Sequence, residues 1–142
     1  MKYSKYTERL IKEWRSYGKI IIAVDFDSTI SPYPTIDNDE DIMRCVKLLQ
    51  RARSIGAYIV IHTCCAVGRY EDILGFCKNN GIEVDSVNKN PIELPFGHQN
   101  KPYANVFLDD RAGFIETMNI LEDACNVIAG EKNTQSTLSQ QF

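Results

Sequence analysis

No stretch of this 142-residue chain is apolar for long enough to cross a lipid bilayer. Its longest apolar runs have the length of a β-strand, whereas a membrane-spanning helix needs about 20 predominantly apolar residues. The residues that follow Met1 also lack the apolar segment of a secretory signal. We therefore expect a soluble, cytoplasmic protein that does not act at a membrane.

A regular cysteine pattern is absent as well. The chain has five cysteines, an odd number, and none of them forms the CxxC spacing of zinc ribbons and redox motifs. Disulfide frameworks belong to secreted proteins, where cysteines come mostly in even numbers. The pattern therefore indicates reduced thiols, in agreement with a cytoplasmic location.

The length of the chain leaves no need for a second domain. A chain of this size folds around one hydrophobic core that buries about two thirds of its unfolded surface. We expect three parts: a basic amphipathic helix over residues 1–19, a central domain over 20–129, and a polar, loose tail over 130–142.

The first 19 residues are basic although the net charge of the chain is −3. Apolar and aromatic residues recur there at helical spacing, and Gly18 is placed to end the helix. These residues are Tyr6, Leu10, Ile11, Trp14 and Tyr17. We favour a helix that packs this stripe on the domain and leaves its charges in water. The alternative is a basic patch that binds nucleic acid.

Strands and helices alternate along the rest of the chain. An apolar strand begins at Ile20, and further strands are expected over 57–63, 82–88 and 105–110, with helices over 39–55, 69–80 and 112–129. This alternation is typical of parallel βαβ units with right-handed crossovers. The predicted fold is therefore α/β: a Rossmann-like three-layer sandwich with a central parallel sheet, in a single domain without a cap domain.

Acidic and hydroxyl side chains follow three of these strands. Asp25 and Asp27 end the first strand, Thr63 the second, and Asp109 and Asp110 the last. The carboxyl ends of parallel strands open on one edge of the sheet, where α/β proteins bind their ligands. Neighbouring carboxylates repel one another unless a cation or a shared proton offsets their charge, so the pattern predicts a site for a hard metal ion. A solvated turn after the strand is the alternative.

Phosphoryl transfer requires this combination of carboxylates for Mg²⁺, a hydroxyl and a lysine for phosphoryl oxygens, and one carboxylate that attacks. In chain order, VDFDST, VIHT, KPY and FLDD resemble the four motifs of the haloacid dehalogenase-like (HAD) phosphohydrolase superfamily. Receiver domains of response regulators use similar residues in a different order. The resemblance covers residues 20–125, and NKNP with KPYANVFLDDRA is similar to short, lidless bacterial and phage members that are uncharacterised.

This resemblance implies that residues 20–129 form a catalytic domain with Mg²⁺ as its cofactor. Asp25 would be the nucleophile that forms an aspartyl-phosphate, and Asp27 would protonate the leaving oxygen and then activate water. The side chains expected to bind the phosphoryl group are Ser28, Thr63, Cys64 and Lys101. The residues expected to hold Mg²⁺ are Asp25, Asp27 through its main-chain carbonyl, Asp109 and Asp110.

The second motif departs from the pattern of the family. Relatives often read Trp-Thr-x-Arg there, whereas this chain has Cys65 at the position of the arginine. A substrate-contacting arginine is therefore missing unless Arg69 replaces it. Lys89 is an alternative to Lys101 for the lysine role, and His98 is a candidate for substrate contact.

No segment is long enough to form a lid over the site. Specificity would then come from the residues around Tyr33, from the loop over 89–100, from a neighbouring subunit of a homo-oligomer, or from a large substrate. Tyr33, Phe96 and Tyr103 could stack on a base or a sugar, or could instead cover the core. The sequence predicts a phosphomonoesterase for nucleotides or nucleic-acid 3′ ends, with sugar phosphates as a further option. A non-catalytic module that retains the fold is the alternative.

Overall fold

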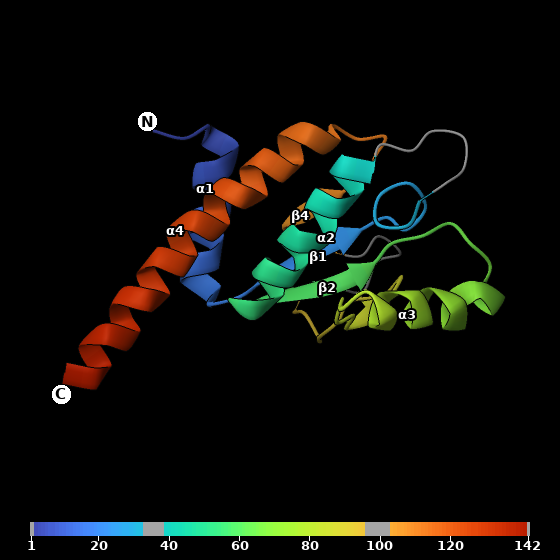
Figure 1. The fold of residues 1–142 in the computed structure, drawn as a ribbon. Helices are drawn as coiled ribbons and strands as arrows, with labels where there is room; N and C mark the ends of the chain where they lie inside the picture. Colours follow the sequence, from blue (N-terminus) through green and yellow to red (C-terminus); the bar gives the residue numbers. More distant parts are fainter. Residues whose placement is uncertain (1, 33–38, 96–102, 142) are drawn as a thin grey trace.

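A four-stranded sheet, parallel throughout, forms the centre of the protein. The structure, a computed structural model, describes residues 2–32, 39–95 and 103–141. The strands are β1 (Ile20–Val24), β2 (Ala57–Ile61), β3 (Ser86–Val87) and β4 (Val106–Leu108), in the order β3-β2-β1-β4. Figure 1 shows helices flanking this sheet. The fold is therefore α/β, a single domain consistent with a Rossmann-like sandwich, as the alternating pattern predicts.

The helices of the described residues are α1 (Lys5–Tyr17), α2 (Asp39–Ser54), α3 (Tyr70–Asn79) and α4 (Phe114–Gln141), and a short 3₁₀ turn, η1 (Val67–Arg69), precedes α3. In Figure 1, α4 lies beside α1 and its last turns extend past the sheet. Helix α2 packs on β2 and on α4, and α4 also packs on β4. The helices thus hold the strands at fixed positions relative to one another.

One face of the sheet forms the main hydrophobic core. Alternate strand residues such as Ile22, Ile59 and Leu108 join the buried side chains of the helices in a single cluster. On the other face Ala23 and Val60 are buried outside that cluster. Since successive side chains of a strand point to opposite faces, burial on both faces explains why the strands read as continuous apolar runs.

Helix α1 begins and ends where its sequence indicates. The Ser4 hydroxyl accepts a hydrogen bond from the Thr7 amide, and Gly18 ends the helix with φ +73°. Trp14 is buried, but Tyr6 and Tyr17 are 51% and 78% exposed. The predicted aromatic stripe is therefore wrong at these two positions. The helix packs on α4 through its aliphatic residues and Trp14.

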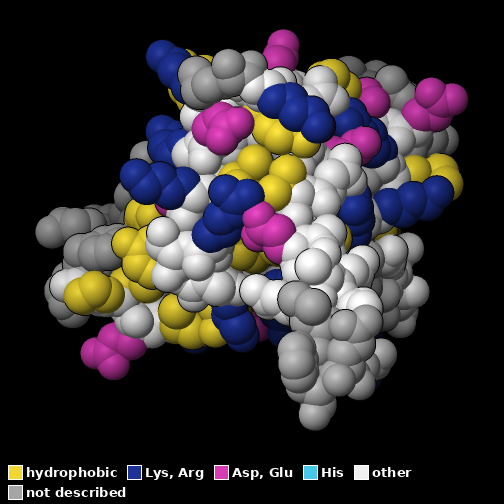
Figure 2. Space-filling view, turned by 90° about the vertical axis from the view of Figure 1, so that its left-hand side faces the viewer, with side chains coloured by type: hydrophobic (Ala, Val, Ile, Leu, Met, Phe, Trp, Pro, Cys, Tyr) yellow, Lys and Arg dark blue, Asp and Glu magenta, His cyan; other side chains and the backbone are white. Residues whose placement is uncertain are grey.

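The side of the molecule that carries α1 has a mixed surface. Figure 2 shows Lys and Arg side chains spread over this face among acidic and apolar side chains. Both arginines of α1 have acidic neighbours: Arg15 pairs with Glu131 of α4, and Arg9 lies 3.9 Å from Glu13. Helix α1 thus offers no uniform positive surface on this side.

The expectation of a loose tail over 130–142 is wrong over the residues that the structure describes. Helix α4 runs without a break from Phe114 to Gln141. The segment is polar but contains no proline, and residues such as Glu131 and Lys132 have good helix propensity. Their side chains also bond to other elements, because Glu131 pairs with Arg15 and Lys132 donates to the Ile55 carbonyl. These contacts extend the helix beyond its apolar part.

The strand predicted over 82–88 is reduced to the two residues of β3. Asp85 and Asn88, on either side of β3, bond to the main chain of β2 through their side chains. The Asp85 carboxylate accepts from the Ile59 amide at 2.8 Å, and it also pairs with Arg53. Polar side chains therefore add to the main-chain bonds that Asp85 and Asn88 make with Ile59 and Ile61 at the two ends of this short edge strand.

None of the helices in the described part of the chain combines the length and apolar character needed to cross a membrane. This finding agrees with the absence of a membrane-spanning run in the sequence.

The connection between α2 and β2 depends on Gly56, which has φ +111°. A Cβ atom at this position would lie 3.0 Å from the Gly18 carbonyl oxygen and 3.1 Å from Lys132 Nζ. We expect Gly56→Ala to lower the free energy of unfolding by roughly 1–3 kcal/mol. Gly75→Ala, on the exposed side of α3 with no atom within 4 Å of the new methyl, should instead stabilise by up to about 1 kcal/mol. Urea unfolding distinguishes the two, and shifts of the same sign would contradict this interpretation.

Candidate active site

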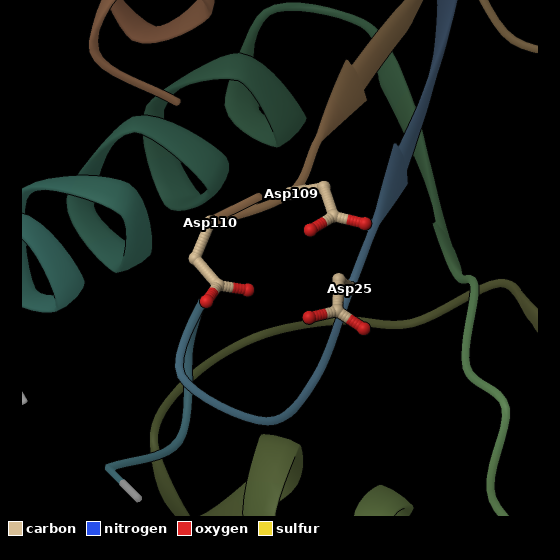
Figure 3. A group of neighbouring side chains, drawn as sticks. All are labelled: Asp25, Asp109 and Asp110. Carbon is tan, nitrogen blue, oxygen red and sulfur yellow. The ribbon is translucent and has the colours of Figure 1, made fainter. Parts of the chain in front are cut away.

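Strands β1 and β4 bring three carboxylates together at the carboxyl edge of the sheet. The register pairs Val24 with Leu108, and the Asp25 amide donates to the Leu108 carbonyl at 2.8 Å. Asp25 and Asp109 are the next residues of the two strands and therefore lie side by side. Carboxylate oxygens of Asp25, Asp109 and Asp110 lie within 4.8 Å of one another, and Figure 3 shows the three side chains around a common space.

A tight turn follows Asp25 and brings the chain back toward it. The Phe26 carbonyl accepts from the amides of Ile30 and Ser31 at 3.2 and 3.1 Å. The Phe26 ring is buried and meets Phe76 of α3 edge to face, with 5.3 Å between the ring centroids. Ser28 adopts φ +62° within the turn. The anchored ring and the turn together place the Thr29 hydroxyl beside Asp25.

Thr29 is fully buried and lies between two of the carboxylates. Its hydroxyl oxygen is 3.0 Å from Asp25 Oδ2 and 3.2 Å from Asp110 Oδ1, and it accepts from the Asp110 amide at 3.1 Å. A hydroxyl has one proton to donate, so it can satisfy only one of the two carboxylates at a time. The sequence alone does not reveal this position of Thr29 between the acids.

The crowding of these acids changes the pKa of the Asp25 carboxyl group. Burial is the largest cause that raises this pKa from 3.8 to about 6, and the charges of Asp109 and Asp110 also raise it. Hydrogen bonds from Thr29 and from the Phe26 amide lower the pKa, but they do not cancel the increase. A half-buried carboxylate with two acidic neighbours is an environment that favours a bound cation. The structure thus brings Asp25, Asp109 and Asp110 together as the sequence predicts.

The Asp27 carboxylate lies apart from the three-acid cluster. It pairs instead with Arg69 of η1, with 3.5 Å between Asp27 Oδ2 and Arg69 Nη1, and the two side chains are 42% and 51% exposed. An exposed pair of this kind contributes about 0–1 kcal/mol, so it opens easily. Metal binding through the Asp27 carbonyl and phosphate binding by Ser28 stay predictions.

Thr63 follows β2 and is 9% exposed. Its amide and carbonyl bond to the side chain of Asn88, and its hydroxyl oxygen accepts from the Cys65 amide at 3.2 Å. Cys64 is exposed, and its contact with phosphate stays a prediction. Sequence reasoning missed Asn88; its position as the last residue of a predicted strand, directly before Lys89, was the only signal.

Several other predicted residues lie beside another strand, at the opposite edge of the sheet, or outside the described part of the chain. Lys101, Tyr33, Phe96 and His98 lie outside the described residues. Lys89 is two residues beyond β3, which β2 separates from β1. Tyr103 lines a cavity of about 400 Å³ with Ile21 and Tyr58, at the strand beginnings and therefore opposite the acids.

Comparisons with known proteins identify a protein of similar fold but indicate no function for it. No family model matches the chain, and no curated protein matches it significantly. A solved structure of a conserved protein from Bacteroides thetaiotaomicron is similar, with a TM-score of 0.55 and 28% sequence identity over 67% of this chain and 78% of that one. The likeness supports an α/β protein of this architecture, and membership of the HAD superfamily stays a prediction.

The raised pKa of Asp25 predicts how stability depends on pH. Between about pH 4 and 6 the native state binds more protons than the unfolded state, so the metal-free protein loses stability as pH rises through this window. The amide side chain introduced by Asp25→Asn carries no charge at any pH, so this variant does not lose stability in the same way. We expect the variant and the wild type to differ little at pH 4, and the variant to be more stable by about 1–2 kcal/mol above pH 6.

Urea unfolding in the presence of a chelator, from pH 4 to 7.5, measures this difference. Asp72→Asn, at an exposed position in the first turn of α3, is the matched control and should gain no stability above pH 6, because an acidic side chain near a helix N-terminus is stabilising. An advantage of Asp25→Asn that is the same at every pH would show that the carboxylate is not destabilised by its surroundings.

Proposed function

We propose that the protein is a Mg²⁺-dependent phosphomonoester hydrolase of the HAD-like type, which forms an aspartyl-phosphate at Asp25. The observation that carries the proposal is the cluster of Asp25, Asp109 and Asp110 at the carboxyl edge of a parallel sheet. Ligand sites of α/β proteins lie at this edge. The ordered motifs of the sequence support the same assignment.

The three carboxylates fit a small hard cation. Mg²⁺ binds oxygen at about 2.0–2.1 Å, so two of its ligands lie at most about 4.2 Å apart. The oxygens of the cluster are within 4.8 Å of one another, and a small inward rotation of the side chains brings them into range. A bound Mg²⁺ would offset the negative charge of the carboxylates and of the substrate phosphate.

The reaction would proceed in two displacements at phosphorus. In the first, an Asp25 oxygen bonds to phosphorus, the ester P–O bond breaks, and Asp27 gives its proton to the leaving oxygen. In the second, Asp27 takes a proton from water, the water oxygen bonds to phosphorus, and the bond to Asp25 breaks to release inorganic phosphate. Both side chains are partly exposed, which suits the entry of water.

The separation of Asp27 from the cluster supports this division of labour. Asp25 lies among the acids that would bind the cation, so it is suited to attack a phosphoryl group held there. Asp27 lies outside the cluster beside Arg69, and its exposed ion pair can open at little cost. Asp27 is therefore free to exchange a proton with the leaving group. Lys101, outside the described residues, is predicted to offset phosphoryl charge.

Turnover of a generic aryl phosphate with Mg²⁺ tests the proposal directly. We expect activity that chelation abolishes and Mg²⁺ restores, and we expect Asp25→Asn to lower kcat by about 10³-fold or more because an amide cannot attack. Asp72→Asn should retain full activity. Mg²⁺ should also raise the Tm of the wild type and have a much smaller effect on Asp25→Asn.

The result separates the two functional classes. A stabilising effect of Mg²⁺ without turnover on aryl phosphates, nucleotides, sugar phosphates or 3′-phosphorylated oligonucleotides would identify a non-catalytic module that binds a cation. Turnover that survives exhaustive metal removal, or that Asp25→Asn retains, would refute the proposed site.

The choice between a small substrate and a nucleic-acid end depends on α1. Because two arginines of α1 have acidic neighbours and the surrounding face is mixed in charge, we expect α1 to have a structural role and the substrate to be a nucleotide or a sugar phosphate. Replacing Lys5, Arg9 and Lys12 by glutamine should then leave kcat/KM unchanged for an oligonucleotide and for an aryl phosphate. A salt dependence of about −0.7 in log-log slope per phosphate contact, lost in this variant, would instead establish nucleic-acid binding.

A further inference from the structure

The side chain of Asn88 makes three hydrogen bonds at the end of β2. Its Oδ1 accepts from the Thr63 amide at 2.8 Å, and its Nδ2 donates to the Thr63 carbonyl at 2.7 Å and to the Tyr70 hydroxyl at 2.8 Å. One side-chain amide thus satisfies both main-chain groups of Thr63. The orientation of the amide follows from its partners, since the reverse would place oxygen against carbonyl and NH₂ against NH.

The backbone explains why a side chain performs this task. The Asn88 amide still donates to the Ile61 carbonyl at 2.8 Å, as a residue of β3 would. At Asn88 the chain turns away with φ +54°, a left-handed conformation that asparagine adopts more readily than most residues. The main chain therefore leaves β2 at this point, while the side chain continues the pairing as far as Thr63.

The bonds between the Asn88 side chain and the Thr63 main chain fix the position of the Thr63 hydroxyl. The hydroxyl oxygen accepts from the Cys65 amide at 3.2 Å, which leaves its proton available for donation. Among the residues that the structure describes, that hydroxyl donates no hydrogen bond. Thr63 also stands at the same edge as the acids, because β2 and β1 are parallel and Val24 pairs with Ile61. The hydroxyl can therefore donate to a ligand at this edge.

We propose that Asn88 is a positioning residue, which holds Thr63 so that its hydroxyl donates to the phosphoryl group during transfer. This inference rests on the proposed function. Asn88 itself does not contact the substrate. It acts by fixing the main chain of Thr63 on both sides, and Tyr70 at the start of α3 holds the second N–H of the amide.

Two substitutions distinguish the effect of the Asn88 side chain from the effect of its left-handed backbone conformation. Asn88→Gly removes the amide but keeps easy access to φ +54°, whereas Asn88→Ala removes the amide and strains the backbone. If Asn88 positions Thr63, both variants should lower kcat for an aryl phosphate by about 10- to 100-fold, with a smaller change in KM, because a displaced group costs rate more than binding. Wild-type kcat in Asn88→Gly would show that only the left-handed turn matters and would overturn the inference.

A double-mutant cycle identifies the residue through which Asn88 acts. Thr63→Val removes the hydroxyl at nearly constant shape, and once it is gone the loss of Asn88 should change kcat little further. Fully additive effects of Thr63→Val and Asn88→Gly would overturn the inference, because Asn88 would then act elsewhere. Amide hydrogen exchange at Thr63 should be faster in Asn88→Gly than in the wild type, because the Thr63 amide has lost its hydrogen bond to the Asn88 side chain.

Ser86→Ala is the matched control for stability. Ser86 is buried in the same connection, and its hydroxyl donates to the Lys89 carbonyl at 2.5 Å without a contact to Thr63. This variant should lose stability but keep its kcat. A wild-type protein without any turnover would overturn both the proposed function and this inference. A wild type that turns over while Asn88→Gly is unchanged would overturn the positioning role alone.

Discussion

Strand β1 is paired on both sides, with β2 and with β4, and both pairings are parallel. This constraint decides what can meet at the edge of the sheet. The registers place Val24 beside Ile61 and Leu108, so the residues that follow these three positions reach the edge together. Acids that are 84 residues apart in the sequence, Asp25 and Asp109, become neighbours because their strands pair. A shift of either register would separate them.

The same pairing brings carboxylates close together, and the protein offsets their mutual repulsion only in part. Thr29 has a single hydroxyl proton for two carboxylates, and the pKa of Asp25 is raised to about 6 by burial and by its acidic neighbours. The turn after β1 and the buried Phe26 ring nevertheless hold the group in place. A site that is destabilised without a cation and well ordered by its surroundings is suited to bind one, because cation binding then removes an existing repulsion.

The sequence predicts the elements that have strong periodicity. Apolar runs and helical spacing indicated the parallel sheet and helices such as α2, and the positions of acids after strands indicated that Asp25 and Asp109 would meet. Contacts made by polar side chains could not be predicted, because they depend on the exact path of the turns. Contacts of this kind are Thr29 between the acids, Asn88 at Thr63, and the ion pair between Glu131 in the second half of α4 and Arg15.

Polar side chains supplement the main-chain bonds at both ends of the short strand β3. Asp85 bonds to Ile59 at one end of β3, and Asn88 bonds to Thr63 at the other. The end of β2 is therefore held by a side chain rather than by a longer neighbouring strand. This arrangement lets the chain turn away from the sheet directly beside Thr63, toward the connection to β4. A main-chain ladder at the same place would order Thr63 equally well, but it would carry the chain further past the edge where a ligand would bind.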